Sequence, residues 1–277
     1  MPELPEVETV CLALSKIVNN SKIRNIKIFR KDLRWNIKEN LKEDLEKDTF
    51  KKPYRRGKYI LIPTIRENIF LIHLGMSGQI KIRSDYYNLS KHDHIQMIIE
   101  TKENRIYSII YNDPRRFGYI DYFSVKEIES HFLLKKLGVE PLSNDLTLEY
   151  FKKKISKKSV SIKNILMDQN IIAGIGNIYA SEILYKAKIN PLRRGDSLNN
   201  ENIKSIIEAT NLILNKSISV GGTSIKNHVQ PDGKLGYFVQ KLKVYGKTKQ
   251  NCKECDNIIS CEIINNRSTY FCSNCQK

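Results

Sequence analysis

Apolar residues recur at helical spacing near the beginning of the chain. The stripe consists of Val7, Val10, Cys11, Leu14 and Val18. A period of about 3.6 residues is typical of an amphipathic helix with one buried face. Pro5 suits the first turn of such a helix, and the polar residues 19–22 end the pattern. We therefore expect a helix packed on a core, with Cys11 as a small buried hydrophobic residue.

Between residue 22 and about residue 123 the pattern changes to short runs rich in Ile, Tyr and Phe, separated by polar or Gly/Pro turns. The runs are IRNIKIF, KYILIPT, NIFLIHLG, QIKIR, HIQMIIE, RIYSIIYN and RFGYIDYF. Runs of this composition are typical of β-strands. Seven or eight such strands predict a sandwich or a barrel against which the first helix packs.

Helical periodicity returns after the segment LGVEPLSND. The helical runs are LEYFKKKI, VSIKNILMD, GNIYASEILYKAKI and NENIKSIIEATNLILNKSI. A Gly-rich loop at 221–238 then leads to a tail with four cysteines. The fold class predicted is therefore α+β. We expect an N-terminal β-sandwich domain at 1–136, a linker at 137–150, a helical domain at 151–239 and a metal-binding tail at 240–277.

The charge of the chain narrows the class of partner. Its 277 residues include 47 Lys and Arg against 30 Asp and Glu, which gives a net charge of +17. A surface of this sign attracts polyphosphates, and nucleic acid is the commonest such partner. The richness in Lys, Asn and Ile also fits a low-GC coding bias, so charge indicates binding and not chemistry.

The same composition argues against a membrane or secreted protein. No apolar stretch in the sequence approaches the roughly 18–20 residues that a membrane span needs, and no signal peptide precedes the first helix. We expect a cytoplasmic protein without a membrane partner.

Four cysteines form a pattern with metal-ligand spacing. Cys252-x-x-Cys255 is followed after sixteen residues by Cys272-x-x-Cys275, while Cys261 lies outside the pattern. Two such pairs predict a structural zinc site, with a single iron as the chief rival. A bound zinc ion would supply the folding free energy that this short, core-poor segment lacks.

An arginine lies between the two cysteine pairs. The stretch NNRSTYFC predicts a β-hairpin whose Asn-Asn turn is followed by Arg267. A hairpin held rigid by metal can deliver a guanidinium fork to a phosphate group. The alternative is an arginine that is merely solvated.

Several fragments occur in one order along the whole chain. They are PELPEVET, RRGKY, HLGMSG, KHDH, DPRRFG, MDQNIIAGIGNIYASEILY, GGTSI and CxxC followed by RSTYFCSNCQ. Together they resemble the formamidopyrimidine-DNA glycosylases, bacterial enzymes that remove 8-oxoguanine and ring-opened purines from DNA. The sister family of endonuclease VIII typically opens with PEGPEI, so PELPEV favours the branch that acts on purine lesions.

This resemblance implies a base-excision-repair DNA glycosylase that also cleaves abasic sites. We expect a monomer that binds double-stranded DNA with oxidised purines, holds one structural Zn²⁺ ion and is nucleoid-associated in a bacterial cytoplasm. Two other functions remain open: an endonuclease VIII-like glycosylase for oxidised pyrimidines, and a zinc-dependent DNA-binding protein without activity.

The resemblance gives the residues at the start of the chain a catalytic role. After removal of the initiator methionine, the amino group of Pro2 would attack the sugar, release the base and form an imine that leads to β,δ-elimination. An α-amine titrates near ~8 and a lysine near ~10.4, so more of the α-amine is free at neutral pH. Glu3 would move protons, and Lys58 and Arg267 would complete the catalytic set. The ordinary alternatives are a helix-start carboxylate for Glu3 and a strand-end surface charge for Lys58.

Removal of a base from the stack leaves a gap in the duplex. The resemblance implies that Met76, Arg115 and Phe117 fill this gap. An apolar wedge with a cationic fork suits the task because stacking recovers part of the lost energy. The alternative places Met76 and Phe117 in the core, but the Gly and Pro residues beside them indicate turns.

Other positions match the family's phosphate contacts. These DNA-binding candidates are His73, His92, Lys163 and Asn177, together with Arg267. The stretch AGIGNIYA follows a predicted helix and lacks the dinucleotide fingerprint. It resembles the turn of a helix-two-turns-helix motif, whose amides can approach phosphate at a helix N-terminus. His92-x-His94 could bind a metal, but no third ligand is evident.

The Gly-rich loop corresponds to the family's lesion-recognition loop. The set implied is Glu6, Ser77, Thr223, Ile225, Lys226, Asn227 and His228. The carbonyl of Thr223 would accept a hydrogen bond from N7–H of 8-oxoguanine, whereas N7 of guanine is itself an acceptor. Residues 226–228 depart from the usual family sequence, which leaves side-chain contacts and lesion preference open. A flexible linker is the alternative.

Overall fold

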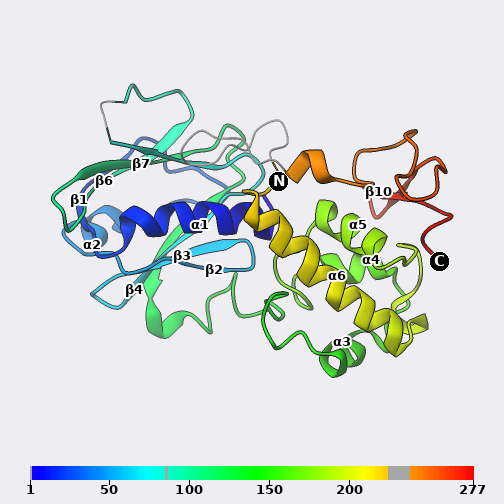
Figure 1. The fold of residues 1–277 in the computed structure, drawn as a ribbon. Coiled ribbons are helices and arrows are strands. Elements are labelled where there is room, and N and C mark those ends of the chain that lie inside the picture. The colour runs from blue at the N-terminus through cyan, green and yellow to red at the C-terminus, as the bar shows by residue number, and fades with distance from the viewer. Residues whose placement is uncertain (1, 85–86, 224–237) are drawn as a thin grey trace. The chain divides into compact units, whose positions relative to one another are not determined.

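The structure, a computed structural model, describes residues 2–84, 87–223 and 238–277. Its contacts divide the chain into two compact units (Figure 1). The first unit comprises Met1–Lys135 with Val220–Tyr237, and the second comprises Lys136–Ser219 with Phe238–Lys277. The predicted helical domain at 151–239 also included residues 220–223, which the described contacts group with the first unit.

The first helix follows the apolar stripe of the sequence. Helix α1 spans Leu4–Val18 with Pro5 in its first turn, and the whole stripe is buried. It packs against strands β2 (Tyr54–Arg56) and β3 (Tyr59–Pro63) (Figure 1). Cys11 is only 3% exposed, and burial raises the pKa of its thiol to about 12. The predicted helix and the predicted burial of Cys11 are confirmed.

The first unit contains two antiparallel four-stranded sheets. Their strand orders are β1-β6-β7-β5 and β2-β3-β4-β8. The remaining strands are β1 (Lys22–Ile28), β4 (Asn68–His73), β5 (Gln79–Arg83), β6 (Asp93–Glu100), β7 (Ile106–Asn112) and β8 (Tyr119–Ser124). Every predicted apolar run forms a strand. The polar, three-residue β2 and the short helix α2 (Leu41–Leu45) carry too little periodicity to be predicted.

One core joins both sheets and α1, as a sandwich requires. Strand β6 shows the expected alternation, with Ile95, Met97 and Ile99 buried and the residues between them half-buried. Phe50 and Phe70 are fully buried with ring centroids 6.1 Å apart. The α+β sandwich predicted from the sequence is therefore the fold of the first unit.

The second unit is helical and ends in a hairpin. Its elements are α3 (Leu148–Ile155), α4 (Ile162–Met167), α5 (Asn177–Lys186), α6 (Asn200–Ser219), β9 (Ser260–Ile264) and β10 (Arg267–Phe271). Short 3₁₀ turns lie at Val125–Glu127, Gly195–Ser197 and Phe238–Lys241. Helix α5 is the centre of the unit: eight of its ten residues are buried, and it contacts α4, α6 and β10. All four predicted helices and the hairpin are confirmed.

Within the described ranges, no helix combines the length and the apolar character needed to cross a membrane.

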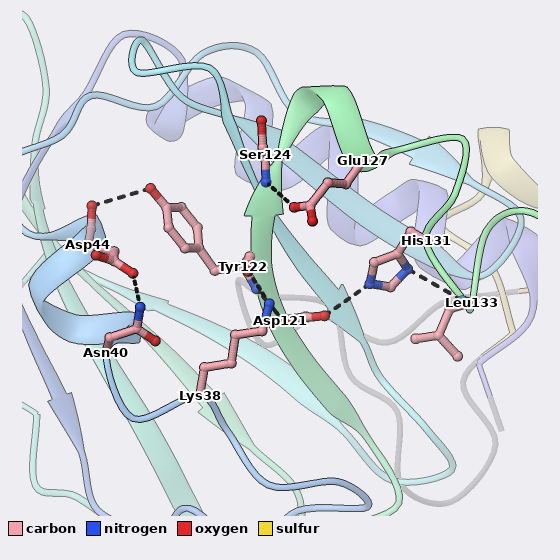
Figure 2. Close-up of polar contacts among 9 residues, drawn as sticks. All are labelled: Lys38, Asn40, Asp44, Asp121, Tyr122, Ser124, Glu127, His131 and Leu133. Carbon is pink, nitrogen blue, oxygen red and sulfur yellow. Dashed lines mark hydrogen bonds and ion pairs between the residues drawn. The ribbon is translucent and has the colours of Figure 1, made fainter.

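Asp121, a buried carboxylate on β8, binds the segment that follows this strand (Figure 2). Asp121 accepts a hydrogen bond from His131 Nε2 at 3.0 Å and forms an ion pair with Lys38 Nζ at 3.0 Å. The Leu133 amide donates to His131 Nδ1 at 3.4 Å, so Nε2 carries the ring proton. Burial alone would raise the pKa of Asp121, but the hydrogen bonds from His131, Lys38 and the Tyr122 amide outweigh it and lower the pKa to about 2.

We predict that Asp121→Asn lowers the free energy of unfolding by about 2 kcal/mol at pH 7, because each unit of pKa shift is worth about 1.4 kcal/mol. A depressed carboxyl pKa stabilises the fold above pH ~4, and this contribution disappears as the pH falls towards ~2. Urea unfolding at pH 7 and pH 3 measures it, with the exposed Glu129→Gln as the control. A variant as stable as the control at pH 7 would contradict the prediction.

Candidate functional site

The residues at the start of the chain are buried and held by Glu6. Pro2 is buried, and Glu3 and Glu6 are each 2% exposed. The Glu3 amide donates to Glu6 Oε2 at 2.8 Å. The backbone amide and the hydroxyl of Thr223 donate to Glu6 Oε1 at 2.7 and 2.6 Å. One carboxylate therefore joins the first turn of α1 to the beginning of the predicted lesion-recognition loop.

A glycine makes this approach possible. Gly222 has φ of +77°, and a Cβ atom there would lie 2.9 Å from Glu6 Oε1. Any other residue would be strained in this left-handed conformation and would press on the carboxylate. Of the predicted lesion-recognition residues, Ile225, Lys226, Asn227 and His228 lie outside the described part of the chain.

Lys58 and His73 form a second part of the predicted site. Lys58 is 9% exposed and lies in the turn between β2 and β3. Burial lowers the pKa of His73 to about 4, and the charges of Lys58 and Arg34 act in the same direction. The Gly75 amide donates to His73 Nδ1 at 3.3 Å. His73 is therefore neutral at pH 7 and carries its proton on Nε2, where it can donate to an anion.

The three predicted gap-filling residues lie at the surface. Met76 is 40% exposed and Phe117 is 44% exposed, so neither belongs to the core. The guanidinium carbon of Arg115 lies 4.8 Å from the centroid of the Phe117 ring, which pairs the cation with the aromatic face. All three, with His73, line a hollow of about 680 Å³.

A buried aspartate holds together the two loops that carry Met76 and Arg115. Asp113 is fully buried and accepts from Ser77 Oγ at 2.6 Å and from the Gly118 amide at 2.8 Å. Ser77 Oγ in turn accepts from the Arg115 amide at 3.1 Å. Arg116 has φ of +57°, so the loop turns sharply here. The Asp113-Pro114 pair marks a turn in the sequence, as expected, but no sequence signal indicates that the Asp113 carboxylate binds both loops. Ser77, predicted to recognise the lesion, positions this loop in the structure.

The two histidines of the KHDH fragment have different surroundings. His94 is buried, and its Nε2 lies 2.7 Å from the carbonyl oxygen of Asp113. His92 is half-buried, and its carbonyl accepts from the Asp113 amide at 3.0 Å. Within the described residues, the cysteine cluster is the only group of three or more His, Cys, Asp and Glu side chains close enough together to hold a metal.

In the second unit, Asn177 and Lys163 both contact the hairpin. Asn177 is the first residue of α5, and its Nδ2 donates to the Ser268 carbonyl at 3.0 Å. Lys163 is 1% exposed and donates from Nζ to the same carbonyl at 3.0 Å and to Thr269 Oγ1 at 2.6 Å. The family resemblance implies a phosphate contact for Lys163. The structure instead buries its ammonium group behind β10, where it positions the strand.

Arg267 lies at the beginning of β10. Asn265 and Asn266 form the turn before it with φ of +46° and +58°, a conformation that asparagine tolerates. Arg267 itself is exposed and pairs with Ile264 across the hairpin. The strand that carries the Arg267 guanidinium group is therefore fixed by hydrogen bonds from Lys163 and Asn177.

The four cysteines of the tail converge on one point. Ligand atoms of Cys252, Cys255, Cys272 and Cys275 all lie within 4.8 Å of one another. The sulfurs of Cys252 and Cys275 are 3.8 Å apart, and those of Cys255 and Cys272 are 3.4 Å apart. A tetrahedral zinc site with Zn–S bonds of about 2.3 Å needs separations of about 3.8 Å. The thiolates therefore fit one structural zinc ion. Cys261 is exposed and, as predicted, is no part of the site.

A buried glutamate supports the approach to this metal site. Glu182 on α5 is 1% exposed and accepts from the backbone amides of Lys243, Val244 and Tyr245 at 2.9 to 3.1 Å. Burial raises the pKa of this carboxyl although the three amides oppose the shift. Sequence analysis missed Glu182 because a charged residue inside a helical pattern ordinarily faces solvent.

Three segments of the chain match known families. Residues 1–120 match the formamidopyrimidine-DNA glycosylase N-terminal domain, and residues 137–229 match the formamidopyrimidine-DNA glycosylase H2TH domain. Residues 249–277 match a zinc finger found in FPG and IleRS.

Individual proteins are similar over the full length. The formamidopyrimidine-DNA glycosylase of Rickettsia felis is 41% identical over 276 residues, which cover 100% of this chain and 98% of that protein. A Lactococcus lactis FPG mutant in complex with Fapy-dG-containing DNA has a TM-score of 0.91 at 34% identity and covers 100% of both chains. The wild-type Lactococcus lactis FPG with oxidised-pyrimidine-containing DNA has a TM-score of 0.90 at 34% identity, also over 100% of both chains.

We predict that Asp113→Asn loosens the two loops that carry Met76 and Arg115. One carboxylate oxygen becomes an NH₂ group that faces existing donors, and a buried donor left without an acceptor costs about 1–3 kcal/mol. Urea unfolding should show a loss of this size, and affinity for duplex DNA should fall with it. Asp145→Asn, at an exposed position of the second unit, is the control. Wild-type stability in Asp113→Asn would refute the bridging role.

Proposed function

Because the chain belongs to the formamidopyrimidine-DNA glycosylase family, we propose that it excises oxidised purines from DNA through a Schiff base at Pro2 and then cleaves the strand by β,δ-elimination. The family is one of base-excision-repair DNA glycosylases, so the general activity follows from membership. Lesion class, covalent intermediate and lyase step are the proposal. The observation that carries it is the carboxylate of Glu6, which binds both the Glu3 amide and Thr223.

The proposed nucleophile is the secondary amine that Pro2 presents once Met1 is removed. Its nitrogen would bond to the anomeric carbon while the bond from that carbon to the base breaks, and the lone pair of the ring oxygen would help expel the base. Pro2 lies two residues before the first residue of α1, whose N-terminal dipole disfavours the protonated ammonium form. Burial acts in the same direction because it penalises the charged form.

Glu3 is placed to serve as the proton carrier. It would donate a proton to the sugar oxygen as the ring opens and leaves an imine, and then accept a proton from the neighbouring carbon during elimination. At 2% exposure its carboxyl group is shielded from bulk water, which favours transfer to substrate over exchange with solvent. Its backbone is fixed by the hydrogen bond to Glu6.

Phosphate contacts would come from four residues of the two units. Lys58 and Arg267 offer charges, while neutral His73 offers Nε2–H and Asn177 stands at the N-terminus of α5. Neutral donors orient the DNA backbone but add little non-specific attraction, whereas the cationic side chains supply most of the affinity for DNA. The exposed Met76, Arg115 and Phe117 would occupy the gap left by the extruded base.

Lesion recognition would depend on the carbonyl of Thr223. Both the amide and the hydroxyl of this residue are bound to Glu6, which fixes the position of the residue that bears the carbonyl. A carbonyl attracts N7–H of 8-oxoguanine and repels the N7 lone pair of guanine. A second candidate is excision of oxidised pyrimidines, because the Lactococcus lactis protein of similar fold was crystallised with such DNA.

The covalent step is tested by borohydride reduction in the presence of duplex DNA with one abasic site. We expect a stable protein–DNA adduct, and peptide mapping should place it on Pro2. A protein whose Pro2 nitrogen is acetylated should give no adduct, because an amide nitrogen is no nucleophile. An adduct on a lysine, or none at all, would rule out the Pro2 intermediate; no adduct combined with no base release would favour the DNA-binding protein without activity.

The lesion class is tested by single-turnover excision from two duplexes that differ only in the damaged base. We expect 8-oxoguanine opposite cytosine to leave at least about tenfold faster than an oxidised pyrimidine, which corresponds to about 1.4 kcal/mol, the scale of one hydrogen bond. Equal or inverted rates would replace the purine proposal with the pyrimidine candidate.

A further inference from the structure

A tyrosine hydroxyl meets one sulfur of the zinc site. Tyr185 lies in the last turn of α5 and is 3% exposed. Its hydroxyl oxygen lies 3.2 Å from Sγ of Cys252, which is itself 1% exposed. The two residues belong to one small apolar cluster with Val244, Ile259 and Cys272. The hydroxyl is therefore placed against a metal ligand inside a dry environment.

The zinc-bound form determines the direction of this hydrogen bond. A cysteine that ligates zinc is a thiolate without a proton, so the phenol must be the donor. Four thiolates and one Zn²⁺ leave a net charge of about −2 on the site, and each donated hydrogen bond withdraws charge from a sulfur. Cys252 also accepts a weaker contact from the Glu254 amide at 3.5 Å.

Packing alone does not account for the hydroxyl. A phenylalanine would fill the same apolar space, whereas a buried hydroxyl is unfavourable unless it has a partner. Within the described residues, Cys252 Sγ is the hydrogen-bond partner of this hydroxyl. The benefit of a tyrosine at this position must therefore come from its contact with the sulfur.

We propose that Tyr185 is a positioning residue of the zinc site, whose hydroxyl donates to the Cys252 thiolate, lowers the reactivity of that sulfur and slows the loss of zinc. The proposal concerns the metal site alone and holds whichever lesion the protein excises. The two ends of α5 then have different roles. Asn177 binds the hairpin strand at one end, and Tyr185 binds the metal ligand Cys252 at the other.

Zinc release from the full-length, zinc-loaded protein tests the proposal. Tyr185→Phe keeps the ring and removes the hydroxyl, and transfer of zinc to a chromogenic chelator should become about tenfold faster, the lower limit typical for loss of an outer-shell partner. The matched control is Tyr270→Phe, because Tyr270 packs against the same cluster and its hydroxyl contacts no ligand among the described residues. Equal release from the wild type and Tyr185→Phe, or equal acceleration in both variants, would overturn the proposal.

A spectroscopic measurement separates charge withdrawal from packing. In the cobalt-substituted protein, loss of the hydrogen bond should move the sulfur-to-cobalt charge-transfer band of Tyr185→Phe to lower energy, and Tyr270→Phe should leave it in place. If Tyr185→Phe fails to hold metal, 3-fluorotyrosine at position 185 serves instead. Its stronger donor should move the band to higher energy and slow zinc release. An unchanged band would overturn the proposal.

Discussion

A buried carboxylate must find donors, and Glu6 finds one three residues before it in the chain and others 217 residues after it. Its two oxygens accept from the Glu3 amide and from the amide and hydroxyl of Thr223. Each hydrogen bond to a charged group is worth about 1.5–3 kcal/mol, and removing one partner leaves a buried charge uncompensated. The Glu6 carboxylate thus fixes the backbone beside the proposed nucleophile and the residue proposed to recognise the lesion. A flexible side chain at the surface could not hold both in place.

The same physical rule positions the other irregular segments. Asp113 binds the two loops that carry Met76 and Arg115, and Glu182 accepts from three consecutive amides near the zinc site. At Lys163 the buried group is a cation instead of a carboxylate, and it donates hydrogen bonds to a carbonyl and a hydroxyl of β10. Loops lack the ladders of helices and sheets, so their backbone groups need other partners. Buried charged groups supply those hydrogen-bond partners, and their hydrogen bonds constrain the orientation of the backbone more than apolar packing does.

Sequence reasoning recovered what periodicity encodes and missed what these buried charges do. The stripe from Val7 to Val18 and the Ile-rich runs predicted α1 and the strands because burial repeats with the period of each element. The two cysteine pairs predicted the zinc site because ligand spacing is local. Asp113 and Glu182 gave no such signal, since their donors come from distant turns. The resemblance gave Lys163 a phosphate contact, and only the folded chain shows that its ammonium group is buried against β10.

In the proposed DNA complex, the zinc ion would influence the phosphate contact of Arg267 without contacting the DNA. Helix α5 has ten residues and is therefore about 15 Å long, a rod with the Asn177 amide at one end and the Tyr185 hydroxyl at the other. Both ends contact the metal-binding tail, one at the Ser268 carbonyl and the other at Cys252. Because Cys272 follows β10 directly, the metal fixes the strand that carries Arg267 and presents the Ser268 carbonyl to Asn177 and Lys163. Loss of the ion would free both contacts together, so the metal site determines where the guanidinium group lies within the second unit.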